Sequence, residues 1–277
     1  NMLAAALCAA LILGSCGSAG NPSSETTSSV PESSTAEASE TTPEPIFSSA
    51  EEYPRVDGST ANLPLMARVM QDTCGISAEE AENLTQNTGT NTSWNRLVNN
   101  EADLLLVYEA PQETQEEIKK SGVELEVTAV GRDALVFLVN SGNSLDGLTQ
   151  DQLRDIYTGK VTNWKELGGK DQEIFPFQRN ATSGSQTMFL KLLMGAITPM
   201  DPPEQLISGA MGQLIDSVAS YDNSDGAIGY SVYYYAAMMY ENPDLKLLAV
   251  DGVAPSNESI ADGSYPLLND FYLAIRA

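Results

Sequence analysis

Residues 178–187 contain the clearest candidate for chemistry in the sequence. This segment is small, rich in hydroxyl side chains, and carries one glycine and one arginine, Arg179. An apolar run precedes it, and apolar residues at helical spacing follow it. A loop at a helix start exposes backbone N–H groups and the positive end of the helix dipole, which together hold an oxyanion. Arg179 adds a planar set of donors suited to phosphate or carboxylate. The same pattern also fits a simple helix N-cap beside an unrelated arginine.

Two further loops have the same character. Residues 57–61 and residues 87–93 are rich in hydroxyl groups, and each precedes a run with apolar residues on one helical face. Three such loops can converge on one small anion and surround it with N–H and O–H donors. Three unrelated caps would give the same sequence pattern, so the loops alone leave both interpretations open.

A fourth loop places a carboxylate, Glu109, directly after an expected buried strand at residues 103–108. Ligands of α/β proteins bind beyond the carboxyl ends of strands. An ionised Glu109 could accept the proton of monohydrogen phosphate, whereas sulfate has no proton to give and would meet like charge. Glu109 could equally be an acid at a helix start that complements the dipole.

The composition limits the possible functions. The formal charge is −24 over 277 residues with a pI near 4.1, which argues against nucleic-acid binding, since that needs a basic surface. There is no histidine, which removes Ser-His-Asp and Cys-His nucleophiles and His-containing metal sites. We therefore expect no catalytic residues, no metal and no cofactor. A small anion can still bind, because donors in a cleft act locally while net charge is screened over about 8 Å.

The N-terminal part of the sequence has the features of an exported, anchored protein. Residues 1–16 are largely apolar, too short to span a membrane, and end in small residues before Cys16. This pattern resembles the lipobox of bacterial lipoproteins, in which the equivalent of Cys16 is lipidated; an ordinary signal peptide that contains cysteine is the alternative. Residues 17–52, rich in Ser, Thr, Glu and Pro, are expected to form a disordered tether. Only Cys74 then remains, which excludes a disulfide framework.

The folded part begins near Tyr53 and alternates short apolar runs with amphipathic stretches. We expect strands at residues 103–108, 125–130, 134–139, 227–230 and 245–250, and helices at 111–120 and 151–157, with a capping-box start at Ser77. Strands that alternate with helices indicate an α/β fold with mainly parallel sheets.

The chain resembles the phosphate-binding lipoproteins of bacterial phosphate ABC transporters. The segments that carry the resemblance are 57–60 (DGST), 133–140 (DALVFLVN), 148–169 (LTQDQLRDIYTGKVTNWKELGG), 179–185 (RNATSGS), 226–230 (GAIGY), 251–255 (DGVAP) and 263–266 (GSYP). The resemblance implies an α/β, two-lobed, periplasmic-binding-protein-like type II fold with a ligand cleft between lobes joined by two crossover strands. Residues 53–134 would form lobe 1, to which 268–277 return, and residues 135–267 would form lobe 2.

The resemblance also implies the ligand set. The corresponding phosphate-binding residues would be Ser59, Thr60, Ala61, Thr90, Asn91, Thr92, Glu109, Arg179, Ser183, Gly184 and Ser185. Two positions depart from the family pattern. Glu109 stands where an aspartate is usual, and Ala181 stands where the family often has an acid that pairs with the arginine. Arg179 therefore lacks that local partner.

The implied function is capture of inorganic phosphate and its delivery to the permease subunits of an ABC importer. The protein would be a monomer, anchored through Cys16 to the outer face of the bacterial cytoplasmic membrane. A phosphate-sensing or surface protein without transport, a binder of another oxyanion, and a secreted phosphatase are the alternatives.

Overall fold

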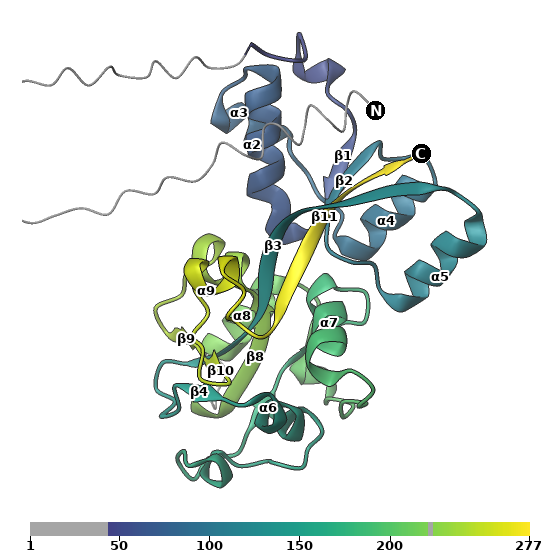
Figure 1. Cartoon of the computed structure of the whole chain (residues 1–277). Helices are drawn as coiled ribbons and strands as arrows, with labels where there is room; N and C mark the ends of the chain where they lie inside the picture. Colours follow the sequence, from purple (N-terminus) through teal and green to yellow (C-terminus); the bar gives the residue numbers. More distant parts are fainter. Residues whose placement is uncertain (1–43, 221–223) are drawn as a thin grey trace, which may run out of the picture.

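The computed structural model describes residues 44–220 and 224–277, which form two lobes joined by two long strands (Figure 1). Each lobe has its own apolar core. Leu104, Leu105 and Leu106 lie in the core of lobe 1, and Phe137 and Tyr230 lie in that of lobe 2. The α/β class and the two-lobed architecture expected from the sequence are confirmed.

Lobe 1 has a sheet with helices on both sides. Its elements are η1 (Ala50–Glu52), β1 (Val56–Gly58), η2 (Thr60–Asn62), α2 (Leu63–Cys74), α3 (Ala78–Leu84), α4 (Thr90–Val98), β2 (Leu104–Val107), α5 (Gln112–Ser121), the first part of β3 (Leu125–Asn140) and β11 (Leu268–Arg276). The apolar spacing explains the placement of α2, because Met66, Val69 and Met70 are all buried. The Ser77 side chain caps α3, as expected, by accepting from the Glu80 N–H at 3.2 Å.

Lobe 2 contains the rest of the described chain. Its elements are the second part of β3, β4 (Gly147–Leu148), α6 (Gln150–Tyr157), η3 (Trp164–Leu167), β5 (Phe175–Pro176), β6 (Gln178–Arg179), α7 (Gly184–Met188), η4 (Phe189–Met194), η5 (Glu204–Leu206), β7 (Ile207–Ser208), α8 (Met211–Ser220), η6 (Ser224–Gly226), β8 (Ala227–Val232), η7 (Tyr235–Met239), β9 (Leu245–Leu247), β10 (Ala249–Val250) and α9 (Asn257–Ala261). The helix that starts at Gly184 continues without a break as the wider turns of η4.

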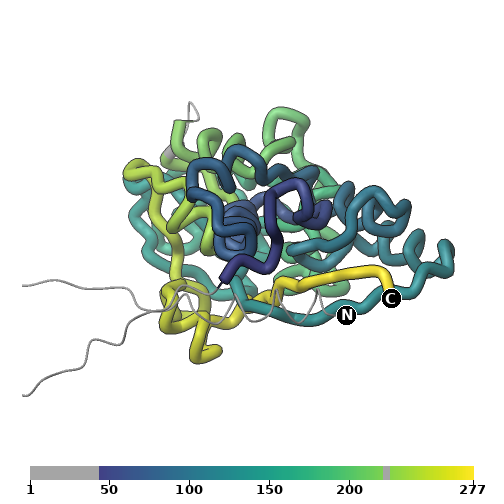
Figure 2. The backbone as a smooth tube through the Cα atoms, turned by 90° about the horizontal axis from the view of Figure 1, so that it is seen from above, coloured from purple at the N-terminus to yellow at the C-terminus, as the bar shows by residue number. Residues whose placement is uncertain are grey.

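The two crossover strands, β3 and β11, connect the lobes and run antiparallel beside each other (Figures 1 and 2). The strand order is β1-β2-β11-β3-β8-β5, and β3 leaves β11 at Ala134 and pairs with β8 from Leu135. The expectation of mainly parallel sheets is therefore wrong for this sheet, whereas the two small sheets, β4 with β10 and β6 with β7, are parallel. Only β1–β2 and β5–β8 pair in parallel within this sheet, because both crossover strands run against their neighbours.

The strands expected at 125–130 and 134–139 form one continuous strand. Gly131, Arg132 and Asp133 stay in the ladder because β11 pairs with them. A β-bulge interrupts the register between Phe271 and Tyr272, and the Phe271 ring covers Gly131, where a Cβ atom would overlap it.

Part of the predicted tether belongs to the folded structure. The N–H groups of Ile46 and Phe47 donate to Thr73 O at 2.7 and 3.0 Å, and Phe47 packs with Tyr53 against the outer face of α2. Residues 1–16, with Cys16, and residues 17–43 lie outside the described residues. Within the described ranges, no helix is long and apolar enough to cross a membrane, and no group of His, Cys, Asp and Glu could hold a metal ion.

Candidate functional site

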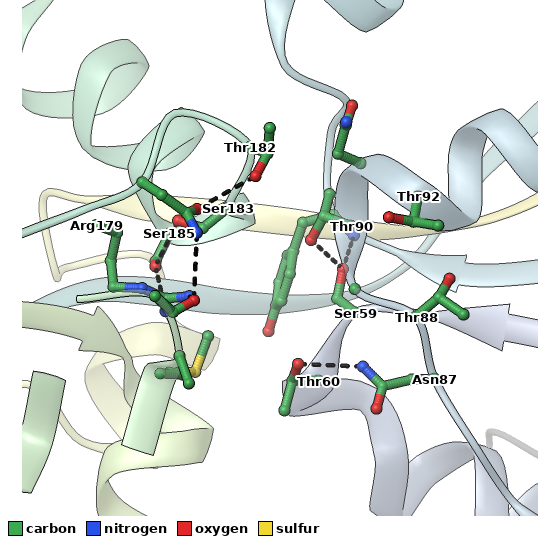
Figure 3. A pocket seen from close by; sticks show the side chains of 18 of the residues that line it. Ser59, Thr60, Asn87, Thr88, Thr90, Thr92, Arg179, Thr182, Ser183 and Ser185 are labelled. Carbon is green, nitrogen blue, oxygen red and sulfur yellow. Dashed lines mark hydrogen bonds between the residues drawn. The ribbon is translucent and has the colours of Figure 1, made fainter. Parts of the chain in front are cut away.

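A cavity of about 520 Å³ lies between the lobes, and polar side chains from both of them line it (Figure 3). The lining residues are Ser59, Thr60, Asn87, Thr88, Gly89, Thr90, Asn91, Thr92 and Tyr108 from lobe 1, and Arg179, Asn180, Thr182, Ser183, Gly184, Ser185, Gly209, Ala210, Met211, Gly212 and Tyr235 from lobe 2. The three hydroxyl-rich loops singled out in the sequence therefore meet at one place.

On the lobe 1 side, a buried carboxylate fixes the loop before α4. Asp57 is 1% exposed and accepts from Thr88 N at 2.8 Å and from Thr88 Oγ1 at 2.7 Å. Arg96, on α4, forms an ion pair with Asp57 at 2.6 Å. Gly89 caps the helix with φ of +85°, a conformation that side-chain-bearing residues rarely adopt. These contacts set the first turn of α4, residues 90–92, against the cavity.

The hydroxyl groups of Thr60 and Ser59 accept hydrogen bonds from other groups of lobe 1. Asn87 Nδ2 donates to Thr60 Oγ1 at 3.1 Å, so the Thr60 hydroxyl hydrogen stays available to a ligand. Ser59 Oγ accepts from Tyr108 N at 3.0 Å and lies 2.8 Å from Thr90 Oγ1. With Ser59 as donor in that contact, Thr90 also keeps its hydrogen for a ligand. An array of this kind offers donors to an anion.

On the lobe 2 side, carbonyl groups hold Arg179. Its Nε donates to Ser208 O at 3.0 Å and its Nη2 to Gly209 O at 3.1 Å, while Nη1 lies 3.4 Å from Ser185 Oγ. Ala181 provides no acid, and the neutral carbonyl groups of Ser208, the last residue of β7, and of Gly209 bind the guanidinium instead. Arg179 is 8% exposed, and among the described residues it has no carboxylate partner.

A second group of contacts fixes the backbone at Arg179. Its N–H donates to the hydroxyl of Tyr230 at 3.0 Å, and that hydroxyl donates in turn to Gln186 Oε1. The Tyr230 ring stacks on Phe189 at 4.5 Å between centroids. Ser183 caps the following helix by accepting from Gln186 N at 3.1 Å. The arginine and the helix start are therefore held as one unit.

The electrostatics of the cavity favour an anion. Burial lowers the pKa of Arg179, because desolvation penalises its charged form, yet arginine remains protonated in proteins. Among residues 44–220 and 224–277, no Asp or Glu lines the cavity. A buried cation without a counter-ion is costly. A bound anion would complete the charge balance.

The structure brings all but two of the predicted binding residues around the cavity. Ala61 is buried in the core and lines a separate cavity, together with Asp133 and Phe271. Glu109 also lies elsewhere, in a hollow with Trp94 and Ile118. Its carboxylate forms an ion pair with Lys191 and accepts from Gln115 Nε2 at 3.3 Å. The expectation that Glu109 faces the ligand is therefore corrected: its side chain turns outward to an ammonium of the other lobe.

Sequence reasoning missed several lining residues. Asn87, Thr88 and Tyr108 lie in loops that the sequence did single out, but Tyr235 and residues 209–212 were not expected. The segment 208–212 (SGAMG), small except for Met211, is the signal that could have drawn attention to this loop. Its carbonyl groups, not its side chains, orient Arg179.

Comparison with known proteins shows the family of this chain. The model of the PBP superfamily domain matches residues 32–277. The chain belongs to the PBP superfamily. It is 32% identical to the phosphate-binding protein PstS of Bacillus subtilis. The matched region covers 53% of this chain and 45% of that protein. It is 28% identical to the PstS of Borreliella burgdorferi, over 56% of the chain and 54% of that protein. The chain thus spans about half the length of these curated relatives.

Solved structures share the fold of this PBP-superfamily chain. One is a crystal structure from Clostridium perfringens, described as a phosphate ABC transporter substrate-binding protein with bound phosphate. It has a TM-score of 0.62 at 23% identity and covers 79% of this chain and 84% of that one. An ABC-type phosphate transport receptor from Vibrio cholerae has a TM-score of 0.57 at 22% identity, with 80% and 86% covered. At these identities the likeness supports the fold alone.

Proposed function

We propose that the protein is an extracytoplasmic solute-binding protein that captures inorganic phosphate and delivers it to an ABC-type importer. The observation that carries the proposal is Arg179, a buried guanidinium that lacks a carboxylate partner among the described residues and lines a cavity of hydroxyl groups. A tetrahedral anion would accept from Arg179, from Ser183 and Ser185, and from Thr60 and Thr90 across the cavity. The names of the PstS relatives support phosphate as this anion.

In this proposal the two lobes act together. Each contributes donors to the same cavity, so a bound anion stabilises the arrangement in which the lobes lie together. Release then requires the lobes to separate. We also propose that Cys16 carries a lipid anchor, that the protein is a monomer, and that it transports phosphate without chemical change. A phosphate-ester hydrolysis assay tests the last point.

Titration calorimetry with phosphate and with sulfate is the deciding experiment. We expect phosphate to bind with one site per chain. Absence of phosphate binding by the folded protein would overturn the proposal. Another oxyanion is the second candidate, because no carboxylate among the described residues lines the cavity to demand a proton on the ligand. Sulfate that binds more tightly than phosphate would favour it.

A further inference from the structure

The ion pair between Glu109 and Lys191 joins the two lobes outside the cavity. In lobe 1, β2 is followed by the buried Tyr108 and then by Glu109. Lys191 lies 82 residues later, in η4 of lobe 2. The side chains are 31% and 51% exposed. Arg132 and Asp270 pair between the crossover strands, whereas pairs such as Arg96–Asp57 and Lys160–Asp155 lie within one lobe. The pair of Glu109 and Lys191 must break when the lobes move apart on that side.

The helix that carries Lys191 also approaches lobe 1 closely at the cavity. Gly184 starts α7, and a Cβ atom placed there would overlap Oγ1 of Thr90 in lobe 1. Lys191 follows seven residues later, in the wider turns that continue the same helix. One helix of lobe 2 thus touches lobe 1 twice, at the cavity through Gly184 and at the rim through Lys191.

Gln115 helps to orient the lobe 1 partner. Its Nε2 donates to Ala110 O at 2.8 Å and to Glu109 Oε1 at 3.3 Å. These bonds hold the carboxylate toward Lys191 and away from the cavity that Arg179 lines. Glu109 is therefore placed to act on the position of the lobes, not on the ligand.

We infer that Glu109 and Lys191 form a closure contact that raises anion affinity and slows anion release without touching the anion. The inference rests on the proposed function and adds to it. The pair exists only when the lobes lie together, so its interaction energy stabilises the closed state. The apparent affinity for the anion then rises because a larger fraction of the protein is closed. The pair is partly exposed, so its effect is modest and weakens with salt. It also changes the affinity for every anion by one common factor.

The test compares Lys191→Met, Glu109→Gln and the charge-swapped double variant, Glu109→Lys with Lys191→Glu. The matched control is Lys160→Met, which removes the same charge from an ion pair with Asp155 inside lobe 2. Phosphate dissociation is followed by stopped flow at low and high salt. We expect the single variants to release phosphate about 1.5- to 5-fold faster at low salt, the control to match the wild type, and the swapped pair to recover slow release. Single variants that release phosphate at the wild-type rate would overturn the inference.

Two further measurements distinguish this inference from the proposed function. The ratio of phosphate to sulfate affinity should not change in Glu109→Gln; a changed ratio would mean that Glu109 contacts the ligand, and would refute the inference. Spin labels at Ser121→Cys and Thr162→Cys, both exposed and one in each lobe, report the distance between lobes without any ligand. Lys191→Met should shift this distance distribution toward longer values. If the wild type binds no phosphate, the proposed function fails, and this distance measurement alone decides whether the closure contact exists.

Discussion

Replacement of Arg179 by methionine tests the electrostatic basis of the site. Methionine keeps much of the side-chain length but removes the charge and all five N–H donors. A hydrogen bond to a charged group contributes about 1.5–3 kcal/mol. Loss of the guanidinium should therefore raise the dissociation constant for phosphate by about 10- to 150-fold. Titration calorimetry measures this change directly.

The same substitution should affect the unliganded protein much less. Arg179 is 8% exposed and has no ion-pair partner among the described residues, so its removal also removes a desolvation cost. We expect the free energy of unfolding without phosphate to change by less than about 1 kcal/mol, since the lost bonds to Ser208 O and Gly209 O are offset by that relief. The loss thus appears in ligand binding and not in folding.

Thermal unfolding supplies an independent reading. Phosphate at 1,000 times the wild-type dissociation constant stabilises the folded state by about 4.1 kcal/mol, and a 100-fold weaker variant keeps about 1.4 kcal/mol at the same concentration. Arg154→Met is the matched control, because Arg154 pairs with Asp151 on the surface of lobe 2. A folded Arg179→Met variant whose phosphate affinity stays within about threefold of the wild type would refute the electrostatic reasoning.

Three other predictions follow from single contacts. Gly184→Ala places a Cβ atom against Thr90 Oγ1 and should weaken phosphate binding by about 1–3 kcal/mol, as measured by calorimetry; unchanged affinity would show that the loops do not approach as described. Asp57→Asn removes the buried charge that pairs with Arg96 and should lower the free energy of unfolding by about 1.5–3 kcal/mol in urea titrations, whereas an unchanged midpoint would argue against this network. The Arg55 guanidinium lowers the pKa of Asp103 from 3.8 to about 2, so this carboxylate stabilises the fold above pH 4 and loses its effect as pH falls through 2. In Asp103→Asn, the free energy of unfolding measured by urea titration should depend less on pH between pH 4 and 2. An unchanged pH dependence in this range would show that Asp103 does not have a lowered pKa.

Local patterns predicted the parts of the fold that depend on local physics. The apolar spacing of α2 identified its buried face, and the run before Tyr108 identified β2, because burial periodicity follows directly from helix and strand geometry. The three hydroxyl-rich loops were found in the same way, since each lies at or next to a helix start. These features need no knowledge of distant partners.

The incorrect expectations for β3 and Glu109, and the unforeseen orientation of Arg179, depended on residues far away in the sequence. β3 runs through Gly131 because β11 pairs with it, and Arg132 meets Asp270 at a separation of 138 residues. Glu109 follows a strand as expected, but its direction is set by Lys191 on the other lobe. The orientation of Arg179 comes from Gly209 O, 30 residues away. A single sequence does not encode such pairings in a local pattern.

The position of β11 has a consequence for how the chain folds as it is made. β11 lies between β2 and β3 in the sheet, although every other element of the described chain precedes it in sequence. Lobe 2 has all the strands of its own sheet before Leu268 is synthesised, whereas lobe 1 lacks a central strand until then. During synthesis β2, a fully buried LLLV strand in the final fold, has an unpaired edge, and such edges promote association between chains. Within the described chain, the sheet of lobe 1 is thus completed after that of lobe 2, and β2 keeps an open edge until β11 is made.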